Sequence, residues 1–183
     1  MAKIGVFFAE GYEEIEALTV VDLCRRAGIE VEMVSAYGKE SVCGSHGIDV
    51  KMDKGIGEVD FDTLDMIVLP GGMPGTLNLE ACEALMEQLD GFYQKGKYVA
   101  AICAAPSIFG HRGYLQGRKA VCYPSFEEDL AGADVQFVPA LTDGHVICGR
   151  GMGCAIEFSL EIIRALVSAQ KADSIAEAVI YQK

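Results

Sequence analysis

The stretch Tyr98–Pro106, with the sequence YVAAICAAP, places the strongest constraint on the fold of this chain. Val99–Ile102 is continuously apolar, which is typical of a parallel strand covered by helices on both faces. Pro106 is favourable in the first turn of a helix, where its missing N–H costs nothing. We therefore expect Cys103 on a sharp strand-to-helix turn, the geometry of a nucleophile elbow, with a thiol in place of the usual serine. A cysteine that only packs in the core is the alternative.

The composition indicates a globular protein and limits its partners. The chain has 183 residues, 51% hydrophobic and 23% charged, so we expect one domain over residues 1–183. Its formal net charge of −12 argues against nucleic acid or an anionic membrane, because both bind clustered Lys and Arg. The sequence shows neither a signal peptide nor a membrane span. Seven cysteines without a CxxC pair fit reduced thiols, so we expect a cytoplasmic protein.

Apolar runs alternate with helical segments along the chain, which indicates an open, mainly parallel α/β sandwich. We expect buried strands at 3–8, 29–36, 65–69 and 99–102, and a further strand at 119–122. Short strands are expected around a turn at 44–47. The turn signal Thr142-Asp-Gly144 predicts an antiparallel pair formed by 135–138 and 141–148. Helices are expected at 13–27, 79–94, 104–112, 154–168 and 172–181.

Glu16 lies on the same stripe of the first predicted helix as the apolar residues Val20, Leu23 and Ala27. A carboxyl group on an apolar stripe is a candidate for burial, and burial raises its pKa. Glu16 could then stay protonated and donate a hydrogen bond. An acidic residue that only complements the helix dipole is the alternative.

In a parallel α/β sheet the ligand binds at the carboxyl ends of the strands. Gly71 and Gly72 follow the strand at 65–69, and their amides are candidates for an oxyanion hole, with a simple turn as the alternative. The other residues expected near this edge are Gly11, Glu16, Cys103 and Tyr123.

Several common kinds of site are absent from the sequence. It contains neither a P-loop nor the dinucleotide-binding fingerprint GxGxxG. The stretch 149–153 precedes a helix without the spacing of an anion-binding loop, so we interpret it as a tight turn near the site. His46, His111 and His145 are not paired at ligand spacing, so we expect no metal and no cofactor. None of them is well placed for a Cys–His hydrolase.

Cys103 and Glu16 together suit two kinds of thiol chemistry. A thiol at a helix amino terminus has its pKa lowered, commonly to about 4–7. A protonated Glu16 could donate to that thiolate while the Gly72 and Ala104 amides hold an oxyanion, which suits addition to the carbonyl of a small aldehyde. The same thiolate would also be prone to oxidation.

Four motifs follow one another along the chain: EEIE at 13–16, LPGG at 69–72, AICAAP at 101–106 and GMGCAIEF at 151–158. Together they resemble the ThiJ/PfpI superfamily, specifically its parkinsonism-associated protein deglycase branch, over nearly the whole chain. The resemblance implies a flavodoxin-like three-layer sandwich, usually a homodimer. It implies Cys103 as the reactive cysteine, Glu16 as its protonated partner, and the Gly72 and Ala104 backbones facing the incoming oxygen. Further pocket candidates are Gly71, Tyr123, Pro124, Gly151 and Met152.

Three positions depart from the pattern of that family. Ala104 stands where the peptidase branch has a histidine, which argues against peptidase activity. Tyr123 stands where better-known deglycase members have a histidine before the proline, here Pro124, so an imidazole base is missing. Met152 stands where many relatives have a proline, which indicates a different local turn.

The sequence therefore predicts a cofactor-independent glyoxalase or deglycase that acts on small 2-oxoaldehydes or their early adducts. Cys103 would form a hemithioacetal and Glu16 would shuttle the proton. A homodimer built on the helix at 13–27 is expected from the resemblance. The alternatives are a redox sensor or stress chaperone that works through oxidation of Cys103, and a binding module that uses the pocket without chemistry.

Overall fold

A central sheet organises the structure, a computed structural model that describes residues 1–182. Its strand order is β10-β11-β7-β6-β1-β2-β5. Every pair is parallel except β10 with β11, as expected for a mainly parallel sheet. The strands are β1 (Lys3–Phe8), β2 (Glu30–Ser35), β5 (Lys54–Gly55), β6 (Met66–Leu69), β7 (Tyr98–Ile102), β10 (Ala140–Asp143) and β11 (Val146–Gly149).

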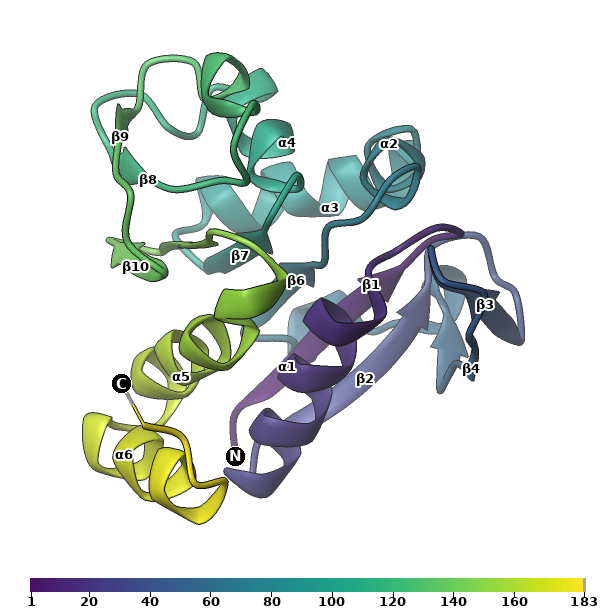
Figure 1. Cartoon of the computed structure of the whole chain (residues 1–183). Helices are drawn as coiled ribbons and strands as arrows, with labels where there is room; N and C mark the ends of the chain where they lie inside the picture. Colours follow the sequence, from purple (N-terminus) through teal and green to yellow (C-terminus); the bar gives the residue numbers. More distant parts are fainter. Residues whose placement is uncertain (183) are drawn as a thin grey trace.

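Helices cover both faces of this sheet, which gives three layers (Figure 1). Successive residues of β7 point to opposite faces, so Ala100 and Ile102 join one core cluster and Val99 and Ala101 join the other. One cluster packs against α1 (Glu14–Arg26), α5 (Ala155–Leu166) and α6 (Ala169–Ala178). The other packs against α2 (Gly75–Glu80), α3 (Glu83–Gln94) and α4 (Pro106–His111). The predicted flavodoxin-like sandwich is confirmed.

The single helix predicted at 79–94 is wrong, because the structure has two helices there. α2 ends at Glu80 and α3 begins at Glu83, with Cys82 as its N-cap. The break contains no Gly or Pro to mark it in the sequence. The Cys82 thiol donates to the carbonyl oxygen of Ala36 at 3.3 Å, a contact between distant segments that ties the break to the end of β2.

The pairing predicted for 135–138 is also wrong. β10 and β11 pair across the predicted turn, but β9 (Asp134–Val135) instead pairs in parallel with β8 (Lys119–Ala120) in a separate small sheet. The short pair of β3 (Ser41–Cys43) and β4 (Asp49–Lys51) forms as predicted. The last helix begins three residues before its predicted start because the Ser168 hydroxyl caps it, accepting the Lys171 N–H at 3.1 Å.

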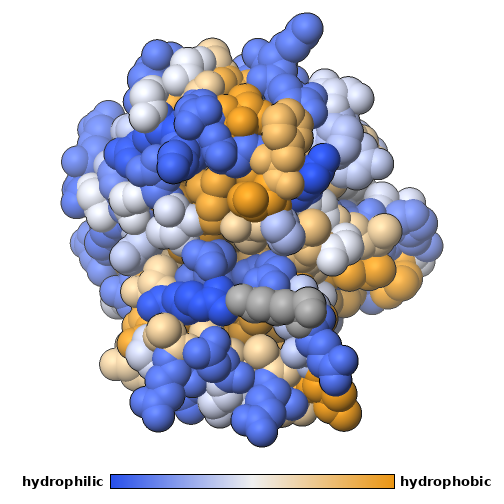
Figure 2. All heavy atoms as spheres, turned by 60° about the vertical axis from the view of Figure 1, so that its left-hand side comes forward, coloured by the Kyte–Doolittle hydropathy of each residue, from blue (hydrophilic) through white to orange (hydrophobic). Residues whose placement is uncertain are grey.

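Phe137 and Val138 lie in the loop between β9 and β10 and not in a strand. Their side chains are 67% and 42% exposed. Figure 2 shows apolar side chains gathered on this side of the molecule, in the part that carries β8 to β10. Among the helices of residues 1–182, none is long and apolar enough to cross a membrane.

Packing in the core predicts a small stability difference that one pair of substitutions can measure. Ile163 of α5 is fully buried, whereas Ile180 is 82% exposed. Ile163→Val should lower the free energy of unfolding by about 1 kcal/mol, because it removes one buried methylene group. Ile180→Val should change it by less than about 0.5 kcal/mol. Urea titration checks both, and equal effects would contradict this assignment of the core.

Candidate active site

The candidate residues meet at the point in the sheet where the strand order changes direction, between β1 and β6. From β1 the chain adds β2 on one side and β6 on the other, and the carboxyl ends of the strands at such a reversal are where ligands bind in open α/β sheets. α1 follows β1 and carries Glu16, the turn after β6 carries Gly71, and the turn after β7 carries Cys103. Three segments that are distant in the sequence therefore reach one place.

Cys103 sits on a strained turn between β7 and α4. Its φ of 67° is in the left-handed region, which a residue with a side chain adopts only when its surroundings enforce it. Its N–H donates to the Gly149 carbonyl at 3.0 Å, and its own carbonyl accepts the Tyr123 N–H at 2.8 Å. Pro106 begins α4, slightly later than predicted. This is the geometry of a nucleophile elbow, and the Cys103 side chain is half-buried.

Glu16 is completely buried, as its place on the apolar stripe of α1 predicted. Its Oε2 accepts the Gly71 N–H at 2.8 Å. Its Oε1 has no conventional hydrogen-bond partner within residues 1–182, and the side chains of Cys103 and Glu13 also act on this carboxyl. Burial raises the pKa of Glu16 to about 7, although the contacts with Cys103 and Gly71 oppose the rise.

Gly71 keeps open the space between the thiol and the carboxyl. A Cβ atom placed on Gly71 would lie 2.7 Å from Cβ of Cys103 and 2.7 Å from Oε2 of Glu16. It would also lie 2.9 Å from the carbonyl oxygen of Ile102. Cys103 and Glu16 are therefore close neighbours on either side of this glycine, and any side chain here would push them apart.

The pKa of the Cys103 thiol is raised in this structure, chiefly by burial and next by the charge of Glu16. The N–H groups of Ala104 and Gly72 act on the sulfur in the opposite direction. The pKa of the thiol, predicted to be lowered by the helix amino terminus, is therefore raised instead. Because the two groups are coupled, ionised Glu16 adds to the effect of burial and disfavours a second negative charge on Cys103.

The remaining pocket candidates lie around this centre at different distances from it. Gly151 approaches Tyr123, since a Cβ on Gly151 would lie 3.2 Å from Cδ2 of Tyr123. Tyr123 is 50% exposed, and Pro124 is exposed as well. Met152 is 48% exposed and lines a cavity of about 250 Å³ at the start of α1.

Sequence reasoning missed two residues that support the site. Glu13 donates its backbone N–H to the Gly71 carbonyl at 2.9 Å, and its carboxylate contributes to the raised pKa of Glu16. The buried Ser107 hydroxyl donates to the carbonyl of Ala104 at 2.7 Å, which holds the elbow against α4. The only sequence signal for Glu13 was its place three residues before Glu16, and Ser107 gave none.

The raised pKa of Glu16 predicts a pH-dependent contribution to stability. Below pH 4.5, the ordinary pKa, Glu16 is protonated in both folded and unfolded chains. Between 4.5 and about 7 only the unfolded chain loses the proton, so stability falls as pH rises. At about 1.4 kcal/mol per pKa unit, the total loss is about 3 kcal/mol. The Glu16→Gln variant lacks this titration. Its free energy of unfolding relative to that of the wild type, measured by chemical denaturation, should therefore rise by about 3 kcal/mol between pH 4.5 and 8. A constant difference would contradict the raised pKa.

The fold and the site define a flavodoxin-like α/β protein with a cysteine on a nucleophile elbow beside a buried carboxyl group. The chain belongs to the DJ-1/PfpI family, whose family model matches residues 2–165.

Protein DJ-1 homolog B of Arabidopsis thaliana is 35% identical over 172 residues, which are 93% of this chain and 39% of that protein. The chain thus spans well under half of that relative. Protein dj-1beta of Drosophila melanogaster is 32% identical over 177 residues, which are 96% of this chain and 95% of that protein. A deglycase of Pyrococcus abyssi is 30% identical over 90% of this chain and 99% of its own length. The structure of oxidised Toxoplasma gondii DJ-1 is 37% identical, with a TM-score of 0.95 over 100% of both chains.

Proposed function

We propose that this protein is a cofactor-independent glyoxalase or deglycase that acts on small 2-oxoaldehydes or their early adducts. Its membership of the DJ-1/PfpI family and the archaeal relative named as a deglycase support this reaction class. Cys103 is the proposed nucleophile and Glu16 the proposed proton carrier. The seven cysteines, all free thiols, favour a reducing, cytoplasmic setting for such chemistry.

The first step is addition of the thiol to the aldehyde. With the pair carrying one negative charge, the Cys103 sulfur attacks the aldehyde carbon as Glu16 gives its proton to the carbonyl oxygen. The product is a hemithioacetal. The N–H groups of Gly72 and Ala104 stabilise negative charge on that oxygen while the bond forms.

The second step moves hydrogen between the two carbons of the substrate. The Glu16 carboxylate removes the proton from the former aldehyde carbon and returns it to the neighbouring carbonyl carbon. The hydroxyl proton passes from the first oxygen to the second, which leaves a thioester on Cys103. Water then hydrolyses the thioester to a 2-hydroxy acid and the free thiol. Overall, one water molecule is added to the 2-oxoaldehyde, and there is no net oxidation.

The observation that carries this proposal is the completely buried carboxyl group of Glu16, which acts on the neighbouring Cys103 thiol. A proton carrier needs a pKa near the working pH, and that of Glu16 is about 7.

The test is formation of lactate from methylglyoxal. Cys103→Ala should reduce turnover to the uncatalysed background, because no other group can form the hemithioacetal. Cys154→Ala, which removes another partly buried thiol, should keep turnover near the wild-type value. Turnover that survives Cys103→Ala overturns the mechanism.

A redox role is the second candidate, favoured by the 37% identical T. gondii relative, whose structure is of an oxidised form. In this role the Cys103 thiol becomes a sulfinate that a protonated Glu16 holds by a hydrogen bond. Treatment with limiting peroxide followed by peptide mass analysis should find two added oxygen atoms first on Cys103. Earlier oxidation of another cysteine would rule out this role.

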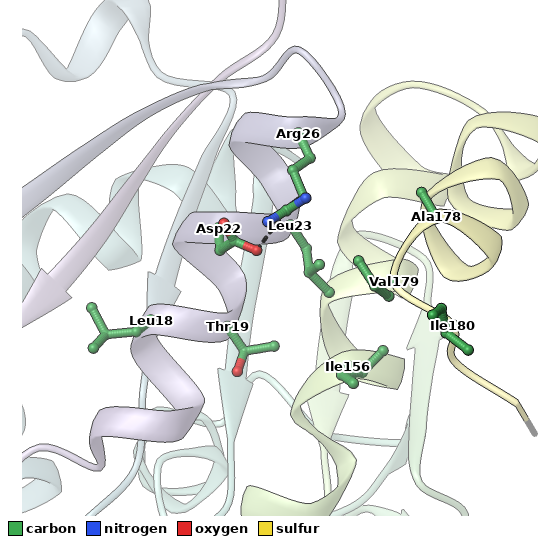
Figure 3. Close-up of a pocket in the computed structure, with 9 residues that line it drawn as sticks. All are labelled: Leu18, Thr19, Asp22, Leu23, Arg26, Ile156, Ala178, Val179 and Ile180. Atoms are coloured by element: carbon green, nitrogen blue, oxygen red, sulfur yellow. Dashed lines mark hydrogen bonds and ion pairs between the residues drawn. The ribbon is translucent and has the colours of Figure 1, made fainter.

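We also propose a homodimer built on α1, with the family resemblance as its main support. α1 leaves apolar side chains incompletely covered beside α5 and the end of α6, around a cavity of about 610 Å³ (Figure 3). Leu18 and Leu23 line it from α1, Ile156 lines it from α5, and Ile180 closes one end. Sedimentation should give the mass of two chains, and a monomer at micromolar concentration would contradict the proposal.

A further inference from the structure

Three side chains that can ligate a metal converge beside the start of α1, apart from Cys103. Glu13 is the N-cap of α1, Glu14 is its first residue, and His46 lies in the turn between β3 and β4. One ligand atom from each lies within 4.8 Å of the others. The three residues are up to 33 positions apart in the sequence, so ligand spacing could not reveal them.

The spacing of these atoms suits a small divalent ion. Nδ1 of His46 lies 3.1 Å from Oε2 of Glu14 and 3.8 Å from Oε2 of Glu13. The Ser45 hydroxyl oxygen lies 3.0 Å from Nδ1 and 3.3 Å from each of these carboxylate oxygens. Tetrahedral Zn²⁺ holds N and O ligands at about 2.0–2.2 Å, which places neighbouring ligand atoms about 3.3–3.6 Å apart. Four of these five distances are between 3.0 and 3.3 Å and the fifth is 3.8 Å, close to the spacing that zinc requires.

Hydrogen bonds hold the cluster together, and a bound ion would replace the one between Nδ1 of His46 and Oε2 of Glu14. The His46 N–H donates to Oε1 of Glu14 at 2.8 Å, which fixes this carboxylate and leaves Oε2 facing the imidazole. A Cβ on Gly44 would lie 2.3 Å from the Glu14 carboxyl group, so only glycine leaves room for Glu14 here. The Glu14 side chain is only 6% exposed, whereas that of His46 is 68% exposed. The Glu14 carboxylate is therefore buried at the start of α1, whereas the imidazole is exposed to solvent.

We propose that Glu13, Glu14 and His46 form a site for a divalent transition-metal ion, with Zn²⁺ as the fitting ion. Imidazole nitrogen and carboxylate oxygen are ligands that zinc accepts, and the neutral imidazole coordinates through Nδ1 while Nε2 faces outward. The Ser45 hydroxyl takes the fourth position or yields it to water. Three protein ligands with an exchangeable fourth make an open site, which shares Glu13 with the surroundings of Glu16.

The test is calorimetric titration of the full chain with ZnCl2 in a buffer that does not chelate metals. We expect one ion per chain in the wild type, and His46→Gln should weaken the dissociation constant at least about tenfold. Glu13→Gln should weaken it as well. His111→Gln is a matched control, because His111 also has two acidic neighbours, Glu80 at Nδ1 (2.7 Å) and Asp129 at Nε2 (3.5 Å). These neighbours lie on opposite ring nitrogens, so they cannot chelate one ion together with the imidazole.

Zinc bound at the thiol of Cys103 is the competing outcome, and Cys103→Ala separates it. Under the proposal Cys103→Ala keeps the His46-dependent binding, and addition of zinc shifts the imidazole NMR signals of His46 but not those of His111. Binding that disappears in Cys103→Ala, or that is equal in wild type and His46→Gln, overturns the proposal. Neither result depends on whether the protein converts methylglyoxal.

Discussion

Gly71→Ala should reduce kcat/KM for methylglyoxal by at least about 100-fold, although it adds a single methyl group. The new Cβ would lie 2.7 Å from both Cβ of Cys103 and Oε2 of Glu16, far inside van der Waals contact. The backbone carbonyl of Ile102 at 2.9 Å leaves it no room on the third side. The nucleophile and the proton carrier must then separate, and displacements of about 1 Å between reacting groups cost about two orders of magnitude in rate.

Gly91→Ala is the matched control for this substitution. Gly91 lies inside α3, and no atom lies within 4 Å of the position of its Cβ. This variant should keep wild-type turnover and gain about 0.5–1 kcal/mol of stability, because alanine is the better helix former. Circular dichroism and thermal unfolding of both variants separate a displaced site from a failed fold. A folded Gly71→Ala variant with wild-type kcat/KM would contradict the proposed roles of Cys103 and Glu16.

The buried strands could be predicted from the sequence because both faces of a parallel sheet impose the same apolar requirement. Val99–Ile102 and Met66–Leu69 are apolar at every position and are buried at every position. The elements that were predicted wrongly depend on contacts between distant segments. The break before Glu83 is tied by Cys82 to the carbonyl of Ala36, and β9 pairs with β8 across a long connection. The local sequence does not indicate which distant segment will be the partner.

In the candidate site, too, some features follow from the local sequence and others depend on contacts between distant segments. Glu16 could be found because a carboxyl group on an apolar stripe conflicts with its surroundings, and Cys103 because the run before it must be a buried strand. The steric role of Gly71 needs the positions of Cys103 and Glu16 together, which sequence order does not supply. The thiol pKa was predicted in the wrong direction for the same reason. The helix amino terminus was visible in the sequence, but the depth of burial and the charge facing the sulfur were not.

Glu16→Gln should change two properties of Cys103 in opposite directions. Turnover of methylglyoxal should fall by about 10²–10⁴-fold, since an amide cannot carry the proton between the two carbons. Alkylation of Cys103 by iodoacetamide at pH 7 should instead become faster, by about tenfold or more. The charge of Glu16 raises the pKa of the thiol, and the neutral amide removes that charge, so a larger fraction is thiolate at a given pH.

Because turnover should fall while alkylation should become faster, this variant tests the coupling between Glu16 and Cys103 directly. A substitution that only damages the fold would lower turnover and speed the alkylation of all seven cysteines, and not that of Cys103 alone. Glu13→Gln is a comparison of the opposite sign, because Glu13 raises the pKa of Glu16 and the charge of Glu16 raises that of Cys103. Glu16 should lose its proton at a lower pH in this variant, so alkylation of Cys103 at pH 7 should become slightly slower. If Glu16→Gln slows alkylation, then Glu16 activates the thiol by donating to it, and the carboxylate charge does not suppress the thiolate. If alkylation becomes faster while turnover is lost, then Glu16 both suppresses the thiolate of Cys103 and is required for its catalytic reaction.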